Sequence, residues 1–570
     1  MTTLSVHLGV TSRSASALVE QCRTQIDKDT AALLESVRVL RSRRNDLARI
    51  SCLPPEILAT VFKYIADEEV LKSYPGHTPE NTPRYCAPAC LIVTHVCRHW
   101  RQVALDFPAL WASINCASAR WLPMMLERSK NDALVVTYSA QALQPCLEQV
   151  LSQLPRIKVL QLCLFSYSEV DVVLDCLSSQ PAPLLQTFRL SHCAGLHHSA
   201  KPWPISDTIF QGRVPRLRSV ELVYCPFNWT SCIFSGLRTL DVRDTGFVFT
   251  SSELLSALRR MPDLEQLSLR RLLIFPEETQ LLGKFPLSQL KHIALDYILP
   301  LTSVVTLFAH LALPIDVTVA LNLAGTVQGP QSFSELLSAM DKDPNEFGSI
   351  IRSLRTSVLY GELGIQFSTS MTFRSNHSWN PRDDNIYDDD IRLSIQFESG
   401  ELQPGVVFDA SRIIAQHKIQ NLFVSSLLTS DLPENFWRAG SVNLPELKVI
   451  HLTGPSVGGL IATLCIEGAQ TSDIMYPSLH AIELENIDFE FEEPEKLWDI
   501  ITMRAKHGAC IRRLRFAMCM NLMAKQVQLL EEVVADVDWD GHEESTESSK
   551  RDSYTCTWNQ YPDSDEDSED

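Results

Sequence analysis

The sequence predicts an α/β protein in which a small α-helical module precedes a long α/β solenoid with a β-rich insertion. Three observations support this fold class. Residues 51–115, here called the helical module, contain two apolar helical segments separated by a polar stretch. A short apolar motif recurs within residues 120–525 at intervals of roughly 20 to 32 residues, a range typical of stacked structural repeats. Between about residues 313 and 414 the motif lapses, and strand-like alternation replaces it.

The composition of the 570 residues is that of a folded chain, with 45% hydrophobic and 21% charged residues. The net charge of −19 argues against nucleic acid as a partner, because phosphate binding requires a basic face. Much of this charge comes from the acidic stretch after about residue 531.

The 16 cysteines are scattered singly, and residues 1–18 lack the apolar core of a signal peptide. We therefore expect reduced thiols and a cytoplasmic or nuclear location.

Residues 299–325 are the one segment apolar enough to be considered as a membrane span. They contain Pro300, Pro314 and Asp316, and their periodicity changes from helical to alternating halfway along. We therefore predict a buried helix followed by a strand, and no membrane association.

A heptad helix is predicted over residues 25–50, after an N-terminal stretch, residues 1–24, that we expect to be disordered. Ile26, Leu33, Leu40 and Leu47 are spaced by seven residues, with Val37 between them, as in a short coiled coil. About three heptads are marginal for a stable dimer. The segment is therefore either a small coiled coil or rigid lever, or a helix that lies on the helical module.

The helical module begins with Leu53-Pro54-Pro55-Glu56, where proline and an acidic residue both suit the first turn of a helix. The apolar residues that follow share one face: Ile57, Leu58, Val61, Phe62 and Ile65. A second helix over residues 93–104 does the same with Val93, Val96, Cys97, Trp100 and Val103. A unit of this size can form only a small hydrophobic core. Its remaining apolar face must therefore pack against the rest of the chain or against another protein.

The module resembles an F-box, in the divergent form found in large fungal families such as those of basidiomycetes. The segments that carry the resemblance are residues 53–58 with 61–62, residues 96–101, and residues 108–111. In that family the helices dock on the Skp adaptor of a cullin–RING ubiquitin ligase. The resemblance implies these partner-binding residues: Leu53, Pro54, Pro55, Ile57, Leu58, Val61, Phe62, Val96, Cys97 and Trp100. A polar insert, residues 66–89, departs from the pattern, and the alternative is a helical pair packed on the chain's own core.

The repeat places apolar residues at the first, fourth and sixth positions. Its copies begin at Ile157, Leu185, Leu217, Leu237, Leu264, Leu290, Ile419, Leu447, Leu479 and Ile511. Each copy should supply a strand and the stretch after it a helix, and neighbouring copies must stack to bury their apolar faces. The pattern resembles the irregular leucine-rich repeats that accompany F-boxes, without the Asn ladder of regular ones. The alternative to leucine-rich repeats is some other α/β array of strand–helix units.

In the insertion, strands are predicted at Ile315–Leu323, Ser357–Phe367 and Ile391–Phe397, and a polar loop at residues 375–390 should project as a long hairpin. At the other end, residues 536–570 are acidic and rich in serine, so we expect a disordered tail.

One pattern favours an enzyme. Ser456 lies in a Gly-x-Ser-x-Gly turn between a predicted strand and helix, as in an α/β-hydrolase. Its possible partners follow in the required order: Asp473 or Asp488, with His480 or His507. No oxyanion loop lies upstream, so we favour a glycine-rich repeat turn and expect no catalytic residue.

Several possible zinc ligands lie close together, but they fall largely on one helix, which does not suit tetrahedral coordination: Cys86, Cys90, His95, Cys97 and His99. We expect no metal and no cofactor.

The expected function is that of a non-catalytic adaptor. It would link a Skp-type adaptor, and through it a cullin scaffold, to an unknown protein target bound by the repeats. The alternatives are a repeat scaffold that binds no adaptor, and a Ser hydrolase centred on Ser456.

Overall fold

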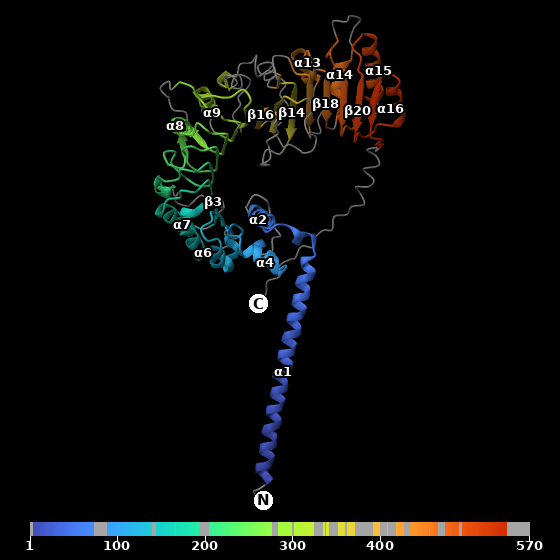
Figure 1. The fold of residues 1–570 in the computed structure, drawn as a ribbon. Helices are drawn as coiled ribbons and strands as arrows, with labels where there is room; N and C mark the ends of the chain where they lie inside the picture. The colour runs from blue at the N-terminus through green and yellow to red at the C-terminus, as the bar shows by residue number, and fades with distance from the viewer. Residues whose placement is uncertain are drawn as a thin grey trace, which may run out of the picture. The chain divides into compact units, whose positions relative to one another are not determined.

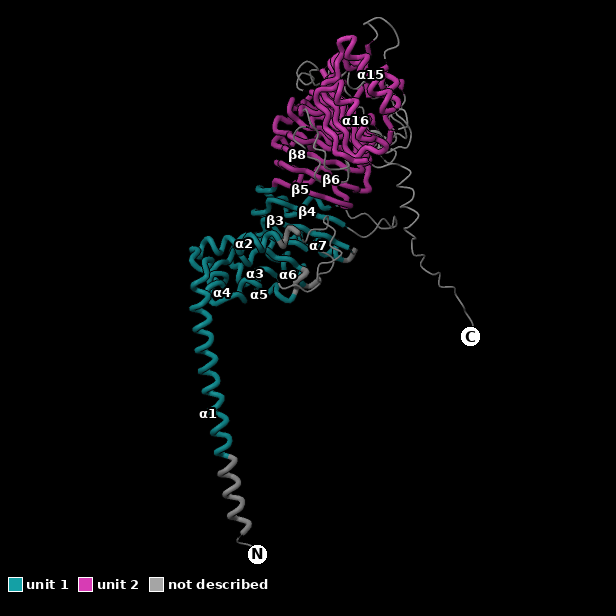
Figure 2. The backbone as a smooth tube through the Cα atoms, turned by 90° about the vertical axis from the view of Figure 1, so that its right-hand side faces the viewer, with its two compact units in different colours: residues 1–217 teal, residues 218–570 magenta. Residues whose placement is uncertain are grey.

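We describe a computed structural model of the chain, which divides into two compact units, residues 1–217 and 218–570 (Figure 2). The structure describes residues 4–72, 88–138, 144–165, 167–192, 205–275, 283–298, 301–323, 335–336, 338–340, 351–359, 362–370, 391–398, 407–408, 418–426, 434–454, 456–465, 474–489 and 493–543.

The first unit opens with a long helix, α1 (Leu4–Asp46). It begins well before the predicted start at residue 25. Residues 4–24 are therefore helical, whereas we had predicted that residues 1–24 would be disordered. The heptad spacing marks only the part of the helix that carries a regular apolar stripe. The preceding residues lack that stripe, but the first proline of the chain is Pro54, so nothing local stops the helix from extending toward the N-terminus.

The helical module begins within a short 3₁₀ helix, η1 (Arg49–Cys52). Its elements are α2 (Pro55–Lys72), α3 (Ala89–Thr94), α4 (Arg98–Leu105) and η2 (Pro108–Trp111). The single helix predicted over residues 93–104 is therefore two helices. The break occurs because Cys97 is extended (φ −156°, ψ 173°) and caps α4, its Sγ accepting a hydrogen bond from the Trp100 backbone N–H at 3.4 Å.

The rest of the first unit alternates strands and helices. Its strands are β1 (Ser113–Asn115), β2 (Leu134–Tyr138), β3 (Ile157–Leu164) and β4 (Thr187–His192), and they pair in parallel in that order. The intervening helices are η3 (Cys116–Trp121), α5 (Leu122–Arg128), α6 (Gln144–Leu151), η4 (Leu154–Arg156) and α7 (Tyr167–Ser179), with η5 (Ile209–Gly212) after β4. The sheet thus begins with β1, directly after η2 and within the last residues of the helical module.

The second unit continues with parallel strands β5 (Ser219–Val223), β6 (Thr239–Arg243), β8 (Gln266–Arg270), β11 (His292–Asp296) and β13 (Thr318–Leu323). Helices α8 (Ser251–Arg259) and α9 (Leu301–His310) separate some of them, and α8 starts with a capping box formed by Thr250 and Glu253. Two short strand pairs lie beside the main sheet: β7 (Val248–Thr250) with β9 (Leu273–Phe275), and β10 (Phe285–Pro286) with β12 (Leu311–Ala312).

In the insertion the strands are β14 (Ser353–Leu359), β15 (Glu362–Ser368) and β16 (Ile391–Glu398). Their order in the sheet is β13-β16-β15-β14-β17, and β15 is antiparallel to both of its neighbours. The single strand predicted over Ser357–Phe367 is thus the end of β14 and most of β15. The alternating pattern could not locate the reversal, because both strands of a hairpin show the same period of two. The predicted loop at residues 375–390 lies outside the described residues.

After the insertion the parallel order resumes with β17 (Asn421–Ser426), β18 (Val449–Thr453), β19 (Ala481–Glu485), β20 (Arg513–Ala517) and β21 (Asp536–Trp539). Helices α13 (Glu434–Asn443), α14 (Gly458–Leu464), α15 (Glu493–Lys506) and α16 (Ala524–Glu531) lie along one side of these strands (Figure 1). In the ten motif copies, every first, fourth and sixth residue is at most 3% exposed, so the motif residues form the core beneath the helices.

Strand β21 corrects the prediction that disorder begins at residue 536. Its acidic residues pair with the basic residues of β20: Asp536 lies 3.6 Å from Arg513, and Asp538 lies 3.5 Å from Arg515. An acidic segment is stable here because the neighbouring strand supplies the opposite charges. Residues 544–570 lie outside the described part of the chain.

The apolar segment at residues 299–325 forms α9 and β13, a helix followed by a strand as predicted. Among the described residues, no helix combines the length and the apolar character needed to cross a membrane.

Burial raises the pKa of Cys116 to about 12 and that of Cys519 to about 11, so these thiols stay protonated and pack as small apolar groups.

Candidate functional site

Helix α2 is apolar on two adjacent sides, and only one of them faces the core. Leu58 and Phe62 are at most 1% exposed and pack inward. Ile57 and Val61, each one residue earlier, remain 51% and 40% exposed, and Ile65 continues the same row one turn later. The helix therefore buries one stripe within the helical module and leaves a second stripe uncovered.

Helix α3 repeats this division. Leu91 and Val93 are buried, whereas Ile92 is 57% exposed, and Val96, between α3 and α4, is 53% exposed. Because α3 packs against α2, two neighbouring helices both present uncovered apolar side chains. We call this set the apolar strip, and it consists of Leu53, Ile57, Val61, Ile65, Ile92 and Val96.

The strip rests on a core centred on two aromatic rings. Trp100 of α4 packs on Phe62 of α2 with ring centroids 4.8 Å apart. Trp111 is fully buried, its indole N–H donates to the Ala104 carbonyl at 2.8 Å, and the Arg128 guanidinium lies over its ring at 4.5 Å. These contacts fix α4 and the chain entering β1, and thereby hold α2 in place.

The ten predicted partner-binding residues fall into three groups. Leu53, Pro54, Pro55, Ile57, Val61 and Val96 are exposed, as a contact surface requires. Leu58 and Phe62 are at most 1% exposed and belong to the core, so in this structure they lie beneath the exposed surface and not on it. Cys97 and Trp100 are half-buried and support the strip from behind. Two exposed residues were missed, Ile65 and Ile92, although the spacing of four from Ile57 through Val61 points to Ile65.

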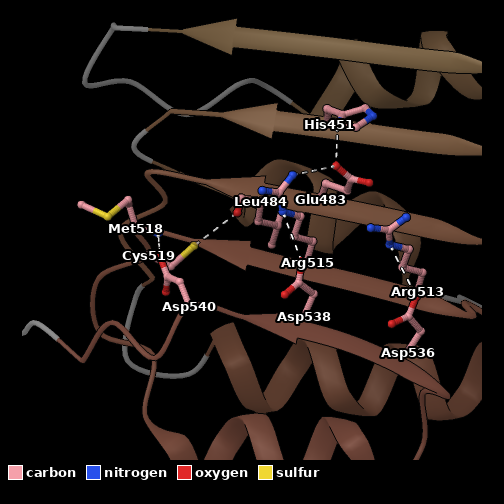
Figure 3. A network of polar contacts seen from close by, with 10 residues as sticks. All are labelled: His451, Glu483, Leu484, Arg513, Arg515, Met518, Cys519, Asp536, Asp538 and Asp540. Atoms are coloured by element: carbon pink, nitrogen blue, oxygen red, sulfur yellow. Dashed lines mark hydrogen bonds and ion pairs between the residues drawn. The ribbon is translucent and has the colours of Figure 1, made fainter. Parts of the chain in front are cut away.

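A second candidate surface is the side of the strands opposite α13–α16. One residue from each of six neighbouring strands forms a row at matching register positions: Arg355, Phe423, His451, Glu483, Arg515 and Asp538. The Phe423 and His451 rings stack with centroids 3.9 Å apart, and the Arg355 guanidinium lies 5.9 Å from the Phe423 ring. Figure 3 shows how the charged half of the row continues toward β21.

Polar contacts connect the charged half of the row. Nδ1 of His451 lies 2.9 Å from a carboxylate oxygen of Glu483, which is also 3.8 Å from the Arg515 guanidinium (Figure 3). The hydrogen bond from His451 is the main cause of a lowered pKa at Glu483, whose ordinary value is 4.5. Arg515 and Asp538 at the end of the row remain more than half exposed, so their charges are available to a partner.

We expect Glu483→Gln to lower the free energy of unfolding at pH 7 by about 1 kcal/mol, because it removes a charge-assisted hydrogen bond. A carboxylate with a lowered pKa stabilises the fold above its unfolded value, here 4.5, and loses that effect as the pH falls through its folded value. The difference from wild type should therefore shrink below pH 4.5. Denaturant unfolding between pH 7 and pH 4 measures it, with the exposed neighbour Glu485→Gln as control. A difference that does not change with pH would contradict this assignment.

Ser456 does not meet the partners that a hydrolase requires. It follows the C-terminal end of β18, and its hydroxyl oxygen accepts a hydrogen bond from the Gly458 N–H at 3.3 Å within the same turn. His480 and His507 precede β19 and β20, so in this parallel sheet they lie at the opposite edge. Asp488 accepts a hydrogen bond from Asn521 at 2.7 Å, and Asp473 lies outside the described residues. The glycine-rich segment is a turn between strand and helix.

The predicted crowding of zinc ligands does not form a site in the part of the chain that the structure describes. Cys90 is buried in α3, His95 is exposed, and Cys97 caps α4. Cys86 falls outside the described residues. Across the described ranges, no group of His, Cys, Asp and Glu side chains is arranged to hold a metal ion.

Comparison with known proteins gives one result for the region that carries the apolar strip. Residues 50–117 match the family model described as F-box-like. No curated protein matches the chain. The matched residues run from η1 through α2, α3, α4 and η2 to just beyond β1, and so include every member of the apolar strip. Residues 50–117 of this chain are an F-box-like domain.

Proposed function

We propose that this chain is a substrate-recruiting subunit of a cullin–RING ubiquitin ligase. F-box domains generally bind the Skp adaptor within these ligases. The observation that carries the proposal is the apolar strip, whose residues lie on α2, on α3 and directly beside them in the F-box-like domain and are exposed in the described part of the chain. An uncovered apolar strip on a small helical domain favours a protein partner.

The Skp-type adaptor would bury the strip and join the chain to the cullin scaffold. Each strip residue is already about half buried, so completing its burial contributes roughly 1 to 1.5 kcal/mol. Six such residues supply a substantial apolar contact, which must also offset the entropy lost on association. Leu58, Phe62 and Trp100 contribute indirectly, because they keep α2 and α3 in position.

The strands and helices of residues 113–539 are proposed to form irregular leucine-rich repeats, stacked as a solenoid. Two features favour this assignment: each motif copy supplies one parallel strand, and helices such as α13–α16 cover the same side of the sheet. The opposite side would then bind the protein target. Its half-buried aromatic pair, Phe423 and His451, lies next to alternating charges, a combination typical of protein recognition.

The mechanism is proximity. A target held by the repeats while the F-box-like domain holds the adaptor is brought near the ubiquitin-charged subunit, which raises its effective concentration there. The bond-forming chemistry belongs to other subunits, so no catalytic group of this chain is required. Such a subunit would act in the cytoplasm or nucleus, where cullin–RING ligases operate.

Adaptor binding is tested by mixing the full chain with a purified Skp-type adaptor and separating the products by size-exclusion chromatography with light scattering. The proposal predicts a complex of one chain with one adaptor. A scaffold whose helical module only caps the repeats predicts two separate peaks at every concentration, which would refute the adaptor role.

Target binding is tested with the swapped pair Arg513→Asp, Asp536→Arg. The swap keeps an ion pair between β20 and β21 but reverses the charge pattern of the strand face. We expect unchanged unfolding, unchanged adaptor binding, and at least a roughly tenfold loss of target capture, because like charges then face each other across the interface. Quantitative affinity purification from the native cell compares the two proteins. Recovery of the same targets in the same amounts would exclude this face.

A further inference from the structure

Helix α1 carries a second apolar surface, separate from the apolar strip. Ile26, Leu33, Val37 and Leu40 share one side of the helix and are between 44% and 69% exposed. Glu35 lies on the opposite side, where it forms an ion pair with Arg98 of α4 at 3.1 Å. The contact with the helical module therefore uses the back of α1 and leaves its apolar seam uncovered.

The charges that flank the apolar seam differ between its two ends. Asp27 and Asp29 flank the seam in the first half, and Arg41 and Arg43 flank it in the second. Asp29 accepts a hydrogen bond from Gln25 at 2.9 Å. Asp27, Arg41 and Arg43 form no ion pair with the described residues. Their opposite charges lie too far apart along one helix to pair with each other, whereas an antiparallel partner helix brings opposite charges beside them.

We propose that α1 pairs with α1 of a second copy of this chain in an antiparallel coiled coil. If Leu33 packs against the partner's Val37, the register places Leu40 beside the partner's Thr30. The same register sets Asp27 opposite the partner's Arg41 and Asp29 opposite the partner's Arg43. Because the dimer is twofold symmetric, each of these ion pairs forms twice.

A parallel pair offers no such match. In that orientation the flanking positions would bring Asp29 beside the partner's Leu34, and Ser36 beside the partner's Arg41. The apolar seam alone does not choose between the two orientations, and its few heptads make it weak. The charge distribution selects the antiparallel pair, and a second copy is the partner that supplies it.

The test uses the full chain and two charge variants. Asp27→Arg, Asp29→Arg makes all four flanking positions basic, and Arg41→Asp, Arg43→Asp makes all four acidic. We expect wild type to show concentration-dependent dimers in sedimentation, each variant alone to associate at least roughly tenfold more weakly, and the two variants mixed to associate again. Adaptor binding should stay unchanged in both variants. Wild type that stays monomeric up to about 100 µM, or variants that associate as wild type does, would overturn the pairing.

Disulfide trapping tests the orientation in a Cys22→Ser background, which removes the one native cysteine of α1. A mixture of Leu33→Cys chains and Val37→Cys chains should form a 33–37 cross-link. Leu33→Cys alone should not form a cross-link with itself, because the two copies of residue 33 are displaced along the axis. A dominant 33–33 cross-link would mean a parallel pair and would overturn the proposal.

Discussion

Replacing Ile57 and Val61 by aspartate is expected to weaken binding of the Skp-type adaptor at least about 100-fold, or roughly 3 kcal/mol. The two side chains form the centre of the apolar strip, and each substitution both removes apolar contact and places an unpaired carboxylate in the interface. Both residues are exposed in the free chain, so the fold should be unaffected. Isothermal titration of the purified adaptor measures the loss.

The matched control is Val442→Asp, the same kind of substitution at an exposed position of α13, outside the F-box-like domain. It should leave adaptor affinity within about twofold of wild type, or roughly 0.4 kcal/mol. Equal losses in the control and the double variant would mean that general surface charge, and not the strip, determines binding. Substituting Trp100 is less informative, because its packing on Phe62 also supports the domain.

Trp111→Ala is expected to destabilise the F-box-like domain by about 3–5 kcal/mol. The substitution empties a fully buried site, removes the hydrogen bond to Ala104 and leaves the Arg128 guanidinium without its aromatic partner. Trp111→Phe keeps most of the ring volume and loses the hydrogen bond, so it should cost about 1–2 kcal/mol. Hydrogen exchange of the α2 and α4 amides reports the stability of this domain directly.

Trp121→Ala serves as the control for this prediction, because Trp121 is only half-buried and lies outside η2. Its effect on exchange in α2 and α4 should be below about 1 kcal/mol. If the α2 and α4 amides exchanged no faster in Trp111→Ala than in Trp121→Ala, the Trp111 ring would not be the centre of the domain core.

The repeat strands could be predicted from the sequence because their signal is local. The fourth and sixth residues of each motif alternate along one strand, and both point into the core, so period and burial agree. The same reasoning failed for β21. Its acidic composition indicates disorder when read alone, and only the arginines of β20 make it a strand. Pairing between segments is not visible in the composition of either one.

The exposed residues of the apolar strip were predicted in part for a related reason. Ile57 and Leu58, and likewise Val61 and Phe62, are adjacent apolar residues on one helix. Periodicity shows that both stripes exist but not which one faces the core, because that depends on where α3 and α4 pack. The side toward Trp100 became the core, and the stripe beside it remained exposed.

Side-chain footprinting with hydroxyl radicals, with and without the purified Skp-type adaptor, measures the exposure of individual side chains and so tests whether the adaptor covers the apolar strip. We expect strong protection of Ile57, Val61 and Ile92 when the adaptor binds, and unchanged labelling of Phe275, an exposed residue of β9. Equal labelling of the three strip residues in both samples would contradict the proposed adaptor binding, since the strip would then stay uncovered and the chain would have no adaptor-binding face there.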